Sequence, residues 1–333
     1  MRICLIMPIY NESANLPDVL ASLDRQTIDH GRLFLIAVDG ESTDGSADIV
    51  RAWLSRSDID GIVLENPRRA IPTSLNLGIE QTREDDFIVR LDAHTTYGAS
   101  YIEDLMRAFE VAPADVVCIG GPQRPGKQTG FDREVVAALL TNPMGLGGAD
   151  FRTSRAPRYC LSPYLGAWRP GTFRVIGGYD ESSLGDEDTE LAARLLSHGM
   201  RSWCIPLESE YRVTKGLLAT ARQWGRYGFW KARTLRRHPR ILRPRHLAPP
   251  LAIFACLGLL ASPARWLLLP LYGAYCTLIW RLRCRPEKPA VTAACCLYFP
   301  VVHAFYGIGL LIGYLKNTEP RRGNLRKPAG RII

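Results

Sequence analysis

The first 120 residues alternate between short apolar runs and stretches with helical spacing of apolar positions. The apolar runs predict five strands, at residues 2–7, 33–38, 61–64, 86–91 and 115–119. The stretches between them predict helices, at about residues 14–25, 45–55, 71–82 and 99–110. Such alternation is typical of an α/β fold with a largely parallel sheet and helices on both faces. Because ligands bind such sheets at the carboxyl ends of the strands, the polar residues there are the first candidates for chemistry.

The pattern is weaker over the next part of the chain. Residues 121–170 are rich in glycine, proline and arginine, and they predict one helix at about 131–141 among long loops that could line a substrate cleft. Residues 186–198 predict a helix with carboxylates at its amino end, and residues 216–238 predict a basic helix with four aromatic residues.

Three later segments contain no charged residue, at residues 247–262, 266–280 and 290–315. The last is long enough to cross a bilayer, which takes about 20 residues. The first two are shorter, and they predict either a tight hairpin or an interfacial piece plus one span. Aromatic residues near the segment ends and flanking arginines favour a membrane region over three buried helices of a soluble domain.

Charge is unevenly distributed along the 333 residues, whose formal net charge is +9. No acidic residue lies between Glu210 and Glu287, and residues 222–245 hold nine lysines and arginines. This charge suggests a polyanionic partner: nucleic acid, an acidic membrane surface or a phosphorylated substrate. Residues 316–333 carry six basic residues and residues 281–288 carry four. Because basic segments favour the cytoplasm, the tail is expected on the same side as the first domain, which requires an even number of membrane crossings.

The cysteines and the amino terminus bear on the compartment. The nine cysteines include no Cys-x-x-Cys pair, which argues against a disulfide framework or a zinc site and is typical of a reducing compartment. Residues 1–10 are too short an apolar run for a signal peptide, so we expect the first domain to stay in the cytoplasm.

Carboxylates and glycines follow the first two predicted strands. PIYNE occupies residues 8–12, and VDGESTDG occupies residues 38–45. Asp39 comes directly after an apolar run, where an acidic residue can accept hydrogen bonds from a nucleobase or ribose. The alternative for residues 42–44 is capping of the helix that follows.

Two further motifs leave alternatives open. NPRRAIPTSLNLG at 66–78 opens a helix whose amino end and Arg69 could face a phosphate, unless its arginines are merely solvated. Asn76 could reach the same pocket or simply pack. In RLDAH, at 90–94, Asp92 and His94 lie on the same side of an extended chain, and imidazole suits Mn²⁺ better than Mg²⁺. The alternative is that His94 only forms a hydrogen bond at a strand end.

Six motifs in order resemble the family 2 inverting glycosyltransferases, over about residues 2–235. They are PIYNE, VDGESTDG, NPRRAIPTSLNLG, RLDAH, GGYDE at 177–181 and EDTELAARL at 187–195. Each motif is weak alone, but the six in order are strong. With RYGFWKARTLRRHP at 226–239 and a hydrophobic C-terminus, the chain looks most like the succinoglycan-type membrane glycosyltransferases of bacterial exopolysaccharide synthesis.

The resemblance implies the GT-A nucleotide-sugar fold, followed by a hydrophobic helical membrane region. It implies a hexosyltransferase that moves a sugar from a nucleotide-diphosphate sugar, with a UDP-sugar expected, to a lipid-linked or polysaccharide acceptor. The catalytic domain would face the cytoplasm at the inner membrane and would bind no nucleic acid. The implied boundaries are 1–215 for the catalytic domain, 216–246 for a basic juxtamembrane segment, 247–315 for transmembrane or membrane-embedded helices and 316–333 for a basic tail.

The resemblance also assigns roles by position. Asp39 matches the aspartate that holds the base and ribose, Asp92 the one that holds the donor diphosphate through Mg²⁺ or Mn²⁺, and Asp188 the catalytic base. His94 would be a second metal ligand, as in the similar Asp-x-His of the polypeptide N-acetylgalactosaminyltransferases. The other expected donor contacts are Pro8, Tyr10, Glu12, Arg69, Asn76 and Arg226. The expected acceptor contacts are Glu187, Gln223 and Tyr227.

The chemistry of sugar transfer supports two separate carboxylate sites. A divalent ion can offset the negative charge that builds on the departing phosphate. A positioned carboxylate must take the proton of the acceptor hydroxyl on the opposite face, and direct displacement would invert the anomeric centre. Clustering of Asp186, Glu187 and Asp188 would raise one pKa, which suits a base, although for Asp186 the interaction with the helix dipole is preferred.

Residues 223–227 have the form Gln-x-x-Arg-Tyr and resemble the Gln-x-x-Arg-Trp element of processive polysaccharide synthases. By analogy Arg226 would face the donor diphosphate, and Gln223 and Tyr227 the acceptor. Because Tyr227 replaces the tryptophan, processivity stays open. A basic amphipathic helix on anionic lipid is the other interpretation, and it holds for residues 233–245 in either case.

Three rival functions have weaker support. A sugar nucleotidyltransferase would want a glycine-rich phosphate loop and a lysine after the first strand, where this chain has PIYNE. A nucleic-acid-binding protein would bind through residues 222–245 with a steep salt dependence, but the long uncharged stretches do not suit it. The retained Asp39, Asp92 and Asp188 argue against an inactive membrane scaffold.

Overall fold

The computed structural model describes residues 1–146, 156–283 and 288–316. Its contacts divide the chain into two compact units. The described part of the first unit comprises residues 1–124 and 156–211, and that of the second comprises residues 125–146, 212–283 and 288–316. The predicted boundary at residue 215 stays a prediction, and the division by contacts assigns residues 125–146 to the same unit as the C-terminal helices.

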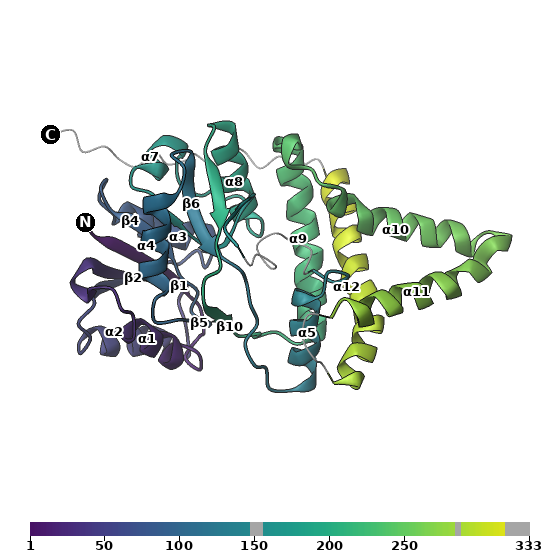
Figure 1. Ribbon diagram of the computed structural model, residues 1–333, viewed down its shortest axis with the longest axis horizontal. Coiled ribbons are helices and arrows are strands. Elements are labelled where there is room, and N and C mark those ends of the chain that lie inside the picture. The colour runs from purple at the N-terminus through teal and green to yellow at the C-terminus, as the bar shows by residue number, and fades with distance from the viewer. Residues whose placement is uncertain (147–155, 284–287, 317–333) are drawn as a thin grey trace. The chain divides into compact units, whose positions relative to one another are not determined.

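An eight-stranded sheet forms the centre of the first unit, in the order β3-β2-β1-β4-β8-β6-β9-β7 (Figure 1). Its strands are β1 (Ile3–Ile9), β2 (Leu33–Asp39), β3 (Asp60–Glu65), β4 (Phe87–Arg90), β6 (Val116–Gly121), β7 (Arg158–Cys160), β8 (Tyr164–Trp168) and β9 (Arg201–Cys204). The neighbours from β3 to β4 are parallel, as are β6 and β9. Strand β8 runs antiparallel between β4 and β6, and β7 is antiparallel to β9. The predicted largely parallel sheet is thus confirmed.

Alternate residues of each strand supply two cores, one on each face of the sheet. Ile3 and Leu5 of β1 join the core that also contains side chains from the first, second and fourth helices, while Cys4 and Ile6 join the opposite core. The helices of the first unit are α1 (Leu16–Asp24), α2 (Ser46–Leu54), α3 (Ile71–Glu80), α4 (Tyr101–Val111), α7 (Thr172–Ile176) and α8 (Glu187–Ser197). Burial on both faces explains why the strands read as continuous apolar runs.

Elements with strong apolar periodicity were predictable, and short ones were not. The five predicted strands correspond to β1, β2, β3, β4 and β6, and the predicted helix at 131–141 is α5 (Phe131–Thr141). Strands β7, β8 and β9 lie outside the prediction, as does a two-stranded sheet of β5 (Thr95–Tyr97) and β10 (Ser209–Tyr211). These strands have three to five residues, so their pairing partners rather than their own pattern determine their conformation. Of the loops expected at 121–170, residues 147–155 lie outside the described residues.

The second unit is helical. Besides α5 it contains α9 (Leu217–Arg237), α10 (Pro244–Leu260), α11 (Leu268–Arg281) and α12 (Pro289–Leu315), with short turns η2 (Pro239–Ile241) and η3 (Pro263–Leu267). Within the described residues, α12 is the one helix long and apolar enough to cross a membrane. The three uncharged segments thus fall in α10, α11 and α12.

Helices α9 and α12 lie against each other with almost no space between their backbones. A Cβ atom at Gly228 would clash with the Tyr306 carbonyl, one at Gly309 with the Gly225 carbonyl, and one at Gly313 with the Phe229 carbonyl. Glycine is therefore needed along this seam for steric reasons. The basic helix predicted at 216–238 is thus packed along the longest apolar helix of the chain.

Candidate active site

The carboxyl ends of β1, β2 and β4 lie at one edge of the sheet. In the parallel register Ile9 lies beside Asp39, and Ile6 lies beside Arg90. Pro8 lies within β1 beside Val38, so it shapes the strand end. The loops with the predicted motifs begin at this edge, as expected for a parallel sheet.

Asp39 is buried at the end of β2, with 5% of its surface exposed. Its Oδ2 accepts a hydrogen bond from the Ser42 backbone N–H at 3.0 Å. Its Oδ1 is buried and has no hydrogen-bond partner among the described residues. Because buried polar atoms are almost always paired in folded proteins, this oxygen has the properties expected of an acceptor for a bound ligand.

Side chains of the 42–44 segment hold the loop after β1. The Asn11 N–H donates to Ser42 Oγ at 2.9 Å, and the Thr43 N–H donates to Asn11 Oδ1 at 2.8 Å. Asp44 Oδ2 accepts from the Ser13 N–H at 2.9 Å. The alternative of helix capping by residues 42–44 holds only in part, because the N-cap of α2 is Gly45, which has no side chain to accept a hydrogen bond. Asp44 does accept a hydrogen bond from the Ser46 N–H in the first turn.

Each arginine of NPRRA has an acidic partner. Arg69 forms an ion pair with Glu41 at 2.6 Å, and its guanidinium lies 5.9 Å from the centre of the Tyr10 ring. Arg68 forms an ion pair with Glu181 at 2.7 Å. Tyr10 is about half exposed beside this pair, so an aromatic face and an arginine lie at the edge next to Asp39.

Asn76 is buried and ties α3 to the GGYDE loop. Its Nδ2 donates to the Tyr179 carbonyl at 3.0 Å and to Glu181 Oε1 at 3.2 Å, while its Oδ1 accepts from the Tyr179 N–H at 2.7 Å. Gly178 lies so close that a Cβ atom there would be 2.5 Å from Asn76 Oδ1. These hydrogen bonds position the 177–181 loop, and the donor contact expected for Asn76 stays a prediction.

Asp92 is fixed by two tyrosines. Tyr164 Oη donates to Asp92 Oδ2 at 2.8 Å, and Tyr97 Oη accepts from the Asp92 N–H at 2.8 Å. Burial raises the pKa of both phenols well above the ordinary value, and the negative charge of Asp92 adds to the rise. Both tyrosines therefore stay protonated and act as neutral hydrogen-bonding groups around this aspartate.

His94 lies between two carboxylates. Its Nδ1 is 3.1 Å from Glu12 Oε1, its Nε2 is 3.8 Å from Asp92 Oδ2, and its ring packs edge-on against Tyr211. Glu12 is itself held by the Asn15 amide at 2.6 Å. Histidines that bind a metal through one ring nitrogen commonly donate the other ring N–H to a carboxylate. In this site Glu12 is the carboxylate beside Nδ1, and Asp92 is the second candidate metal ligand beside Nε2.

Asp92 and His94 are the two candidate ligands of a divalent ion. No group of three or more His, Cys, Asp or Glu side chains that could hold a metal occurs in residues 1–146, 156–283 and 288–316. Asp92 and His94 together offer one oxygen and one nitrogen, which is a donor set suited to Mn²⁺. A diphosphate would then have to supply further ligands, as substrate phosphates do for such ions.

Arg90 connects the end of β4 to the start of α8. Its Nη1 is 2.5 Å from Asp188 Oδ1, and its Nη2 is 3.9 Å from Glu187 Oε1. The Asp188 side chain is 45% exposed, whereas Glu187 and Arg90 are nearly covered. Arg90 Nε is buried without a hydrogen-bond partner among the described residues. The buried guanidinium of Arg90, two residues before Asp92 in the sequence, thus lies beside two carboxylates of α8.

The Glu187–Asp188 pair holds protons more strongly than isolated carboxylates. Burial raises the pKa of Glu187 to about 7, with a further rise from the charge of Asp188 and a fall from Arg90. Removal from water likewise raises the pKa of Asp188, while Arg90 lowers it and Asp92 raises it. The effect of the Asp92 charge on the pKa of Asp188 shows that the two carboxylates lie in one electrostatic neighbourhood.

The predicted residues of α9 belong to the second unit. Gln223 Nε2 donates to Tyr227 Oη at 2.5 Å, one helical turn apart, and Arg226 is exposed. The first unit brings together the predicted residues Tyr10, Glu12, Asp39, Arg69, Asp92, His94, Glu187 and Asp188 at its strand ends and at the start of α8. It adds Arg90, Tyr97 and Tyr164, which the sequence analysis missed. A charged residue at the end of a buried apolar strand was the available signal for Arg90.

Comparisons with known proteins agree with this geometry. Residues 4–155 match the family described as Glycosyl transferase family 2. Over these residues the chain carries a family 2 glycosyltransferase domain, which supports a transferase. It is 27% identical over 284 residues to the succinoglycan biosynthesis protein ExoA of Rhizobium meliloti, covering 84% of this chain and 82% of that protein.

Two other similarities are more limited. The undecaprenyl-phosphate 4-deoxy-4-formamido-L-arabinose transferase of Pseudomonas aeruginosa is 32% identical over 94 residues, which is 27% of each chain. The structure of the mannosyltransferase PcManGT from Pyrobaculum calidifontis in complex with GDP-Man and Mn²⁺ superposes with a TM-score of 0.56 at 22% identity, over 96% of this chain and 88% of that one. At this identity the likeness concerns the fold, which is the GT-A type.

Proposed function

We propose that this chain is an inverting glycosyltransferase that moves a sugar from a nucleotide-diphosphate sugar to a lipid-linked or polysaccharide acceptor at a membrane. The observation that carries the proposal is the ion pair between Arg90 and Asp188 at 2.5 Å, because it places the candidate base beside the strand end that bears Asp92. A donor-holding carboxylate and a base are thus held in one neighbourhood by a rigid strand and a helix start.

The donor would bind along the strand ends of the first unit. The unpaired Oδ1 of Asp39 would accept a hydrogen bond from the base or ribose, with Tyr10 and Arg69 at the rim. Asp92 and His94 would hold Mg²⁺ or Mn²⁺ together with the diphosphate. When bound, the ion would offset the charge on the departing nucleotide diphosphate. Tyr164 and Tyr97 would keep Asp92 in one orientation.

Asp188 would act as the general base. Its carboxylate is nearly half exposed and can therefore meet an acceptor hydroxyl, whereas Glu187 is covered. Burial raises the pKa of Asp188, so its carboxylate is a stronger base than an isolated one, which suits removal of the acceptor proton during attack. Attack from the side opposite the nucleotide would invert the anomeric centre, so an α-linked donor would give a β-linked product.

Arg90 sets the pH at which this base is ionised. Arg90→Gln is expected to move the acid limb of the pH profile of kcat/KM to higher pH by about one unit, because an adjacent arginine lowers a carboxyl pKa by about 1–3 units. Arg90→Lys should restore part of the shift. An unchanged acid limb in a folded Arg90→Gln protein would contradict this role.

His94 is expected to determine the metal preference. His94→Asp should retain activity and shift the preference from Mn²⁺ toward Mg²⁺, because oxygen ligands suit Mg²⁺ better than imidazole does. Activity is measured over a titration of each ion at fixed donor, and Mn²⁺ affinity by electron paramagnetic resonance. His30→Asp, outside the site, is the matched control. The same relative activity with both ions in His94→Asp and native protein would show that His94 only forms hydrogen bonds.

The second unit and the relatives support our proposals for the acceptor and the cellular location. The apolar helix α12 suggests association with a membrane, and a relative named for undecaprenyl phosphate suggests a lipid-linked acceptor. We place the protein at the inner membrane with the catalytic domain in the cytoplasm, in exopolysaccharide or cell-surface glycan synthesis. The acceptor and donor contacts expected for Gln223, Arg226 and Tyr227 of α9 stay predictions.

The direct test of the proposed function is a donor screen. Membranes that contain the protein are incubated with a panel of labelled nucleotide sugars, UDP-sugars first, and with lipid extract from the source cell. We expect one donor to be consumed, with label entering the lipid or polysaccharide fraction and with loss of transfer in EDTA. If no donor is consumed with any extract, the proposal is wrong.

A further inference from the structure

Helices α10 and α11 form an apolar hairpin that the rest of the second unit leaves uncovered. The residues described as buried are His246 and Pro250 in α10 and Ile279 in α11, and η3 between them has none. The exposed fraction is between 57% and 78% for six large apolar side chains: Leu251, Phe254, Leu257, Leu260, Trp266 and Leu269. An exposed apolar surface of this extent marks contact with another apolar phase.

The hairpin is attached to the unit near the start of α10 and along α11, where Tyr272 Oη donates to the Cys296 carbonyl of α12 at 3.1 Å. Gly307 of α12 lies against the backbone of Pro249 and Pro250, and Asn142 Nδ2 donates to the Ile279 carbonyl at 3.0 Å. From there α10 and α11 leave α12 at a steep angle and meet at η3 (Figure 1). The two helix axes therefore run across the direction of α12.

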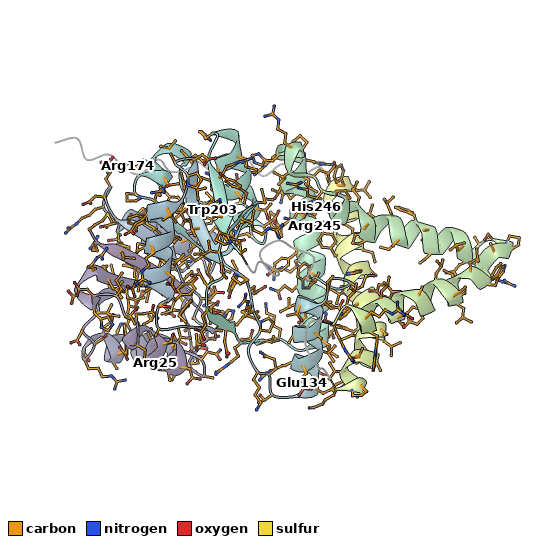
Figure 2. The ribbon with its side chains drawn as sticks, viewed as in Figure 1. Arg25, Glu134, Arg174, Trp203, Arg245 and His246 are labelled. Carbon is orange, nitrogen blue, oxygen red and sulfur yellow. The ribbon has the colours of Figure 1, made fainter. Side chains whose placement is uncertain are left out.

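The charges around the hairpin indicate an anionic bilayer as its partner. Arg245 stands at the start of α10 next to His246 (Figure 2), and Arg281 and Arg283 stand at the end of α11. The Arg283 guanidinium lies 4.4 Å from the centre of the Trp280 ring, an aromatic–cation pair of the kind that occupies the headgroup layer. The uncharged segments 247–262 and 266–280 separate these arginines from Arg265 at the exposed tip.

Helix α12 is long enough to cross the bilayer, but its packing does not suit a span. Its glycine seam holds it against α9, so the two helices share one depth. Arg222, Arg226, Arg236 and Arg237 of α9 are exposed. If α12 crossed the hydrocarbon core, these arginines would enter it as well, at a large cost in free energy.

We propose that the α10–α11 hairpin is the membrane-inserted element, that it crosses the bilayer twice, and that α9 and α12 lie in the headgroup layer on the side where the chain enters. The 17 residues of α10 extend about 25 Å and the 14 residues of α11 about 21 Å, against about 30 Å for the hydrocarbon core. Local thinning of the bilayer and the long side chain of Arg265 at the tip accommodate the difference. The inference rests on the membrane association proposed above.

The test is cysteine labelling of the full-length protein in sealed membranes of known orientation. Ala264→Cys marks the hairpin tip, and Lys316→Cys marks the end of α12. An impermeant maleimide is added on the side opposite the catalytic domain. We expect labelling of Ala264→Cys and no labelling of Lys316→Cys until the membranes are permeabilised. The native chain is the control, because its own cysteines would then lie in the bilayer or on the entry side.

The other outcomes overturn the proposal. Labelling of Lys316→Cys from the opposite side would show that α12 crosses. An Ala264→Cys protein that reacts in detergent but not in sealed membranes would show that the hairpin does not reach the opposite face. Labelling needs no sugar transfer, so a correctly inserted chain that consumes no donor would contradict the proposed function alone.

Discussion

Asp188→Asn is expected to lower kcat for sugar transfer by about 10²–10⁴-fold, the range in which a positioned general base contributes to a rate. Asparagine preserves the size of the side chain and can still accept a hydrogen bond from Arg90, but it cannot take the proton of the acceptor hydroxyl. Donor binding should change little, because Asp188 faces the acceptor in this account. The measurement is transfer of labelled sugar at saturating donor, together with nucleotide binding by calorimetry.

The matched control is Asp186→Asn, two residues earlier in the chain and at the cap position before α8. It removes one negative charge from the same helix start and should keep most of the activity. In Asp188→Asn, Glu187 remains as a carboxylate near Arg90, so we expect the variant to stay folded. A thermal unfolding measurement checks this, and it distinguishes loss of the base from loss of the fold. Full activity in a folded Asp188→Asn protein would rule out Asp188 as the base.

Asp92→Ala is expected to remove metal-dependent donor binding and to lower kcat/KM on the order of 10²-fold. Loss of a residue that only supports a metal ligand typically costs about 10–100-fold, and loss of a ligand itself should cost at least as much. Its carboxylate is the one side chain at this strand end that Tyr164 orients and that lies beside His94. The measurement is nucleotide affinity with and without Mn²⁺. In the native protein the ion should tighten binding, and in the variant this gain should disappear.

The control for this substitution is Asp48→Ala, an exposed carboxylate on α2 that pairs only with Arg51 among the contacts of the described chain. It should leave both affinities unchanged. If Asp92→Ala binds nucleotide as tightly as the native protein and keeps the same response to Mn²⁺, Asp92 does not hold the donor through a metal.

Long elements with a clear apolar pattern could be predicted, because burial on both sheet faces demands it. Strand β1 and helix α5 are examples, and α5 has the predicted bounds. Strand β8 was missed because YLGAW is short and contains a glycine. It is a strand because Trp168 pairs with both Ile88 and Cys118, contacts that join distant parts of the chain. Such pairing is a property of the whole sheet.

The candidate site was predictable as far as it follows from strand ends. Asp39 and Asp92 come directly after apolar strands, and the structure places both at the expected edge. The partner of a side chain was not predictable in this way. Nothing in the sequence around Asn76 indicates that its amide binds the loop at Tyr179, more than a hundred residues later. Likewise, nothing in RLDAH indicates that Arg90 forms an ion pair with Asp188 at the start of α8.

The central claim is that Asp188 drives direct displacement of the nucleotide by the acceptor hydroxyl. The measurement that tests it most directly is the anomeric configuration of the product, determined by NMR with the donor that the screen identifies. The account predicts inversion, so an α-linked donor should give a β-linked product with the native protein and almost no product with Asp188→Asn. A product that retains the configuration of the donor would contradict it.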